Sequence, residues 1–127
     1  MRKVEHFKFK DLQSGYALGD VFWRADTLVK AAKRQNCEVY RLPLEYMDLS
    51  HCRWEKENIF GIADTYMRIR GVNLKYPVII SPDGALIEGY HRVARAFAEG
   101  KRFVVAQRLN EMPPYDEKRA DGEWVKV

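Results

Sequence analysis

Apolar residues recur at helical spacing in three stretches of the chain. The first stretch runs from Asp26 to Arg34, with Asp26 as the predicted N-cap and Asn36 as the predicted stop. The second runs from about Glu57 to Arg70 and the third from Gly89 to Glu99, and each is followed by a glycine that can close a helix. The second helix is predicted to carry one apolar core stripe, formed by Ile59, Ile62, Ala63, Tyr66 and Ile69.

Shorter apolar runs bounded by turn residues indicate strands. Five are predicted, over Val4–Phe9, Glu38–Leu42, Pro77–Ser81, Ala85–Ile87 and Arg102–Leu109. Pro82-Asp83-Gly84 predicts the turn that joins the third and fourth strands, and Leu44–Met47 predicts a single helical turn after Pro43. The order of elements indicates an α+β fold, with a small mixed sheet and helices packed against it.

The length of 127 residues fits one hydrophobic core. Within it we predict an N-terminal strand and helix extension over 1–36, a core over 37–110 and a C-terminal tail over 111–127. The tail contains Pro113-Pro114 and many charges, and its candidate packing residues are Tyr115 and Trp124.

Composition narrows the class of protein. Hydrophobic residues make up 46% of the chain and charged residues 31%, which is typical of a globular protein. No apolar run approaches the roughly 20 residues that cross a bilayer, and the mixed charges after Met1 do not form a signal peptide. Two cysteines are too few for a disulfide framework, so we expect a cytoplasmic protein with reduced thiols. The net charge of +4 favours an anionic partner without requiring one.

The third helix carries the strongest candidate site. At 100° per residue, its predicted buried stripe consists of Tyr90, Val93, Ala94 and Phe97. A neighbouring arc holds three basic side chains, His91, Arg92 and Arg95. The first turn of a helix attracts anions through its unpaired N–H groups and its dipole.

Each residue at this point has a predicted role. Gly89 lets an anion approach the backbone, and Arg92 grips it through two parallel hydrogen bonds. His91 donates to the anion or moves a proton, while Glu88 orients His91, holds a metal ion or acts as a base. The simpler alternative is a solvated basic face in which Glu88 only pairs with Arg92.

The segment Tyr76–Ala106 resembles the core of the ParB/sulfiredoxin superfamily. The shared features are a Pro-led β-branched strand, a turn, a short strand, an acid-Gly-x-His-Arg box at the start of a helix, and a Gly before the next strand. Upstream, Val39–Met47 resembles the opening strand of the family with its Pro-Leu turn. The resemblance spans about Cys37 to Leu109 and fits a compact phage, plasmid or stand-alone bacterial member.

The resemblance implies a nucleotide site at the matching positions. Gly89, His91 and Arg92 match the box that binds nucleotide phosphates in members that use ATP or CTP with Mg²⁺. Glu88 matches the acidic position of the free serine kinases in this superfamily, and Asp48 and Arg53 fall in the loop that lies near the nucleotide. Tyr90 stands where sulfiredoxins have their catalytic cysteine, which argues against sulfinic-acid reduction. The chain ends too soon for the helix-turn-helix domain of the partition proteins.

Three other functions remain open. The chain could be a non-enzymatic DNA-binding module that uses basic side chains, which are Lys30, Lys33, Arg34, Arg68, Arg70, Lys101 and Arg102, with Trp23 and Tyr66 nearby. It could instead be an accessory protein that works through protein–protein contact. His51-Cys52 lacks the spacing of a metal site, so no metal site is predicted, and Cys37 is read as a packing residue. The oligomeric state is left open.

Overall fold

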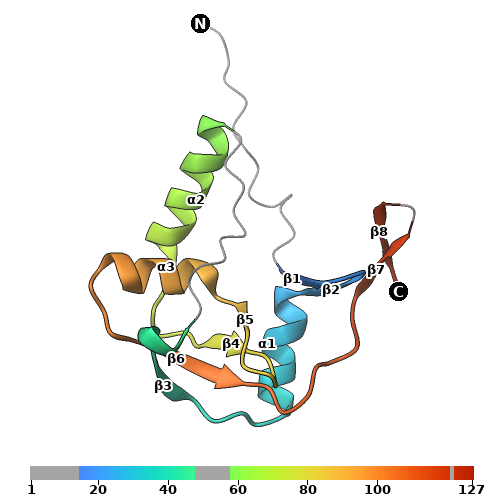
Figure 1. Cartoon of the computed structure of the whole chain (residues 1–127), viewed down its shortest axis with the longest axis horizontal. Helices are drawn as coiled ribbons and strands as arrows, with labels where there is room; N and C mark the ends of the chain where they lie inside the picture. The colour runs from blue at the N-terminus through green and yellow to red at the C-terminus, as the bar shows by residue number, and fades with distance from the viewer. Residues whose placement is uncertain (1–14, 48–57, 121) are drawn as a thin grey trace, which may run out of the picture.

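The computed structural model describes residues 15–47, 58–120 and 122–127, and these form an α+β fold (Figure 1). The helices are α1 (Ala25–Arg34), α2 (Ile59–Gly71) and α3 (Tyr90–Ala98), with a short 3-10 turn, η2 (Leu44–Tyr46). The predicted strand over Val4–Phe9 lies outside the described residues. The other predicted elements between residues 26 and 109 are present, with ends that shift by one to three residues.

The strands form two separate four-stranded sheets. The first sheet has the order β1 (Gly15–Leu18), β2 (Val21–Arg24), β7 (Glu117–Ala120) and β8 (Glu123–Lys126), and every pair in it is antiparallel. The second sheet has the order β3 (Tyr40–Pro43), β6 (Phe103–Arg108), β4 (Val78–Ile80) and β5 (Leu86–Glu88). Its β4–β6 pair is parallel and the other two are antiparallel. The chain passes from β5 through α3 to β6, so α3 lies within the crossover of this mixed sheet.

Local signals set the ends of the helices. The predicted stop at Asn36 is confirmed, because Asn36 takes a φ of 52° and Cys37 N–H donates to the Ala32 carbonyl. Gly100 closes α3 in the same way, with a φ of 72°. The predicted N-cap at Asp26 is wrong, since α1 begins at Ala25 after Arg24 and Asp26 lies in the first turn. In that position its charge still favours the positive end of the helix dipole.

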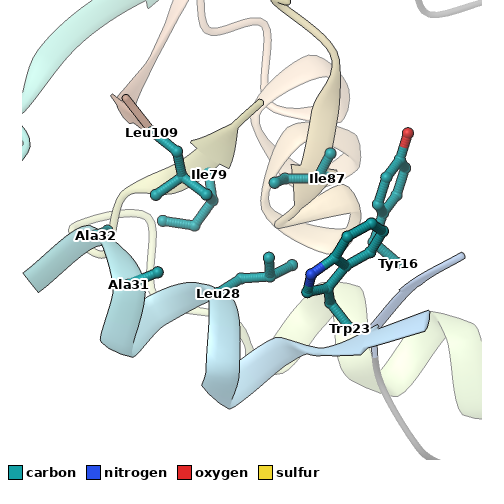
Figure 2. Packing of buried hydrophobic residues seen from close by; sticks show 8 residues of the cluster. All are labelled: Tyr16, Trp23, Leu28, Ala31, Ala32, Ile79, Ile87 and Leu109. Carbon is teal, nitrogen blue, oxygen red and sulfur yellow. The ribbon is translucent and has the colours of Figure 1, made fainter. Parts of the chain in front are cut away.

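One buried cluster joins the first sheet to the second through α1. Figure 2 shows Leu28 pointing between Ile79 and Ile87, beside the stacked rings of Tyr16 and Trp23. Cys37 packs against this cluster, as predicted. A second cluster lies between α3 and the second sheet and contains Leu44, Val78, Ile80, Val93, Ala96, Val104 and Ala106.

Residues 111–127 do more than the predicted tail would. They supply β7 and β8, and the segment before β7 is tied to the N-terminal half of the chain. The Trp23 indole N–H donates to the Pro113 carbonyl at 2.6 Å, and the Asp116 carboxylate accepts from Arg24 N–H at 2.8 Å. Tyr115 stays partly exposed, so indole and carboxylate hydrogen bonds anchor this segment more than the predicted tyrosine does.

The apolar stripe predicted for α2 is not a core stripe. Ile59 is 80% exposed and Tyr66 is 62% exposed, whereas Asp64 on the opposite side is buried. Helix α2 contacts α3 and stands away from the two sheets in Figure 1. Its polar side therefore meets the protein, and the apolar side faces outward. The same kind of error applies to Phe97 of α3, which is exposed while Val93 and Ala96 are buried.

A pair of identical substitutions tests the orientation of α2. We expect Tyr66→Ala to change the free energy of unfolding by less than about 0.5 kcal/mol, because the ring is mostly exposed. We expect Tyr16→Ala, at a buried ring, to lower it by about 3 kcal/mol. Urea denaturation of the two variants measures both values. Equal losses would show that Tyr66 belongs to the core after all.

Candidate functional site

The junction of β5 and α3 is shaped by Gly89. This residue is the N-cap of α3, with a φ of 107°, a backbone conformation that side chains disfavour. A Cβ atom placed here would lie 2.5 Å from Val78 Cγ1 and 2.8 Å from Val78 Cβ. The missing side chain thus makes room for Val78 of β4, a reason for glycine that differs from the predicted approach of an anion.

Glu88 and Arg92 form an ion pair across the first turn of α3. Arg92 Nη1 lies 3.1 Å from Glu88 Oε2, and the two side chains are only 22% and 17% exposed. The Arg92 guanidinium also lies above the Tyr76 ring, with 5.9 Å between Cζ and the ring centroid. Its buried Nε atom has no hydrogen-bond partner among the described residues. Arg92 is therefore held in one orientation and keeps one unused donor.

His91 is half-buried and lies among charges from two helices. Burial lowers the pKa of its imidazole below 6.5, the positive charges of Arg68 and Arg92 lower it further, and Asp64 opposes them. Asp64 and Arg68 come from α2. The Glu88 carboxylate binds Arg92, so the acid that acts on His91 is Asp64 in place of the predicted Glu88.

Asp64 and Arg68 are functional candidates that the sequence reading missed. Asp64 Oδ2 lies 3.4 Å from Arg68 Nε, one helical turn away, and Asp64 Oδ1 is buried without a partner among the described residues. The sequence held a signal for them, an acid and a base four residues apart on the side of α2 opposite its apolar stripe. That signal was set aside because the stripe was taken as the buried side.

The remaining predicted site residues lie elsewhere or outside the described residues. Arg95 donates from Nη1 to the Arg70 and Val72 carbonyls at 3.0 and 2.5 Å, and so binds the C-terminal end of α2. Tyr90 directs its hydroxyl to the Leu86 carbonyl at 2.6 Å. Asp48 and Arg53 fall in the range 48–57, which the structure does not describe.

His91 should make stability depend on pH on the acid side. Between its lowered pKa in the folded protein and about 6.5 in the unfolded chain, only the unfolded chain binds the proton, so falling pH favours unfolding. Above about 6.5 the imidazole is neutral in both states and contributes nothing. Urea denaturation from pH 8 to pH 5 should therefore show a smaller acid loss in His91→Gln than in the wild type. Parallel curves for the two proteins would contradict this prediction.

Comparison with known proteins identifies no relative: no family model, no curated protein and no solved structure matches the chain. The resemblance to the ParB/sulfiredoxin superfamily thus remains a prediction from the residues themselves. Among the helices in the described ranges, none is both long enough and apolar enough to cross a membrane.

Proposed function

We propose that the chain is a ParB/sulfiredoxin-like domain that binds a nucleotide, or another phosphorylated small molecule, at the start of α3. The observation that carries this proposal is the gathering of Arg68, His91 and Arg92 from two helices around a partly buried point. Such a point suits phosphate, since a guanidinium offers paired donors and a protonated imidazole adds another. The proposed setting is the cytoplasm.

The proposed roles follow from the contacts. Arg92 is the main phosphate ligand, because the ion pair with Glu88 and the Tyr76 ring hold its guanidinium in place. The first-turn N–H groups and the dipole of α3 act on the same anion. A bound phosphate would raise the pKa of His91, so we expect binding to tighten as pH falls from 7.5 to 6.

ATP or CTP with Mg²⁺ is the proposed ligand class. Mg²⁺ bound with a nucleotide needs only one or two carboxylates from the protein, because phosphates and water complete its shell. Glu88 is the residue at the junction that would hold the ion or serve as a base. Among the described residues there is no cluster of three metal-ligating side chains, which favours an ion carried mainly by the nucleotide. Phosphoryl transfer, nucleotide hydrolysis and nuclease chemistry all remain reactions to assay, since a fold does not choose among them.

The test is a thermal-shift panel of ATP, CTP, GTP, ADP and inorganic phosphate, with and without Mg²⁺. A ligand at about 100 times its dissociation constant should add about 2.7 kcal/mol of stability. Arg92→Lys keeps the charge but loses the forked donors, so it should remove most of the shift. Arg34→Ala, at an exposed position on α1, is the matched control and should leave the shift unchanged.

Two results would overturn the proposal. A flat panel for the wild type would mean that the site binds none of these ligands, as expected of an accessory protein. A shift that persists in Arg92→Lys and in Arg68→Ala would place the ligand somewhere else on the molecule.

A further inference from the structure

A basic groove runs beside the C-terminal half of α3, away from the proposed nucleotide site. Its first part has a volume of about 620 Å³ and lies between α3, the loop before β4, and strands β3 and β6. These elements lie on the side of the molecule away from the first sheet (Figure 1). The polar lining includes Arg41, Lys75, Arg95 and Lys101, and the apolar lining includes Leu74 and Phe103.

A second hollow of about 540 Å³ continues the first. It shares Lys101 and Phe103 with it, and adds Arg102 and Phe97. We call the two together the basic groove. Because α3 rises about 1.5 Å per residue, its last turn lies roughly 9 Å along the axis from Arg92 in its first turn. The basic groove and the proposed nucleotide site can therefore be tested separately.

The charge of the basic groove favours an anionic occupant. Arg41, Lys75, Lys101 and Arg102 are exposed, and none of them forms an ion pair with another described residue. Arg95 is already paired with Glu99 at 2.9 Å. The only carboxylate in the described lining belongs to Glu45, so the cations are in clear excess.

Flat apolar surfaces inside the basic groove narrow the choice of anion. Phe97 is 67% exposed and Phe103 is 40% exposed, which is unusual for phenylalanine. The Arg41 guanidinium lies over the Phe103 ring, with 4.3 Å from Cζ to the centroid. Nucleic acid bases stack on aromatic rings and on guanidinium planes, whereas an acidic peptide gains little from either.

From this combination of unpaired cations and exposed rings, we infer that the basic groove binds single-stranded nucleic acid. The phosphates contact Lys101, Arg102 and Lys75, and bases stack on Phe97 and on the Arg41–Phe103 pair. Duplex DNA keeps its bases stacked inside, so it can use the cations but not the rings.

The experiment measures fluorescence anisotropy of a labelled oligothymidylate of about 15 nucleotides, a length within the range of one binding domain. We expect Phe97→Ala to weaken binding about tenfold through loss of stacking. We expect the double variant Lys101→Ala/Arg102→Ala to reduce the slope of log affinity against log salt by about one. All three side chains are exposed, so the melting temperature of these variants should match the wild type.

Controls separate this site from general electrostatics and from the nucleotide site. Lys30→Ala/Lys33→Ala removes two exposed cations from α1, and Arg92→Lys alters the start of α3; both should bind the oligonucleotide like the wild type. The inference fails if duplex DNA binds as tightly as the single strand, or if Phe97→Ala has no effect. It also fails if polyglutamate of equal charge competes as well as the oligonucleotide, since the groove would then be an acidic-peptide site.

Discussion

Leu28→Ala is expected to lower the free energy of unfolding by about 2–5 kcal/mol, as large-to-small changes at filled core positions do. The Leu28 side chain is fully buried and lies at the centre of the cluster that joins α1 to both sheets (Figure 2). Its removal leaves a cavity among Ile79, Ile87 and Trp23, which belong to three different strands. The measurement is urea denaturation followed by tryptophan fluorescence, because Trp23 reports on this cluster directly.

The matched control is the same substitution at Leu18, a residue of β1 that is 58% exposed. We expect Leu18→Ala to cost less than about 0.5 kcal/mol. If the two variants lose similar stability, the cluster around Leu28 does not hold the two sheets together as described.

Gly89→Ala should lower the free energy of unfolding by about 3 kcal/mol or more. Two costs add here: the φ of 107° strains an alanine, and its Cβ would lie 2.5 Å from Val78 Cγ1. Because Val78 is fully buried in the second core cluster, it has little room to move. The variant should also lose any nucleotide binding at the start of α3, since that turn would shift.

Gly84→Ala separates the two costs. Gly84 has a similar φ of 96°, but an added Cβ meets nothing within 4 Å. This variant should therefore lose only about 1 kcal/mol, from backbone strain alone. A Gly89→Ala protein no less stable than Gly84→Ala would show that Val78 yields to the added methyl group.

Elements that depend on neighbouring residues could be predicted from the sequence. The Pro82-Asp83-Gly84 turn is confirmed, with Gly84 N–H bonded to the Ser81 carbonyl and the Ser81 hydroxyl bonded to Asp83. The stops at Asn36 and Gly100 are confirmed for the same reason, because a left-handed residue closes a helix by local hydrogen bonds. The ion pair of Glu88 with Arg92 also follows from a spacing of four residues.

Helix α2 shows where the sequence reading failed. Periodicity placed the apolar residues correctly on one side, but it could not say which side would meet the protein. Packing of α2 on α3 chose the polar side and brought Asp64 and Arg68 to His91. The predicted core stripe was therefore wrong, and two members of the candidate site were overlooked.

Contacts between distant segments were equally hidden. The pairing of β2 with β7 joins residues almost a hundred positions apart, and short charged runs such as Glu117–Ala120 carry no apolar alternation to announce a strand. The position of Arg95 is a further case. Its sequence placed it beside His91 and Arg92, yet its guanidinium reaches the carbonyls at the end of α2.

The sequence by itself determined the α+β class, the turns and stops of the elements, and the placing of Glu88, His91 and Arg92 at the start of one helix. These follow from backbone preferences and from spacing along a single element. Only the tertiary structure decided which side of α2 is buried, how residues 111–127 complete the first sheet, and why position 89 must be glycine. Those outcomes depend on which surfaces meet, and the packing energy that selects them is shared among residues far apart in the chain.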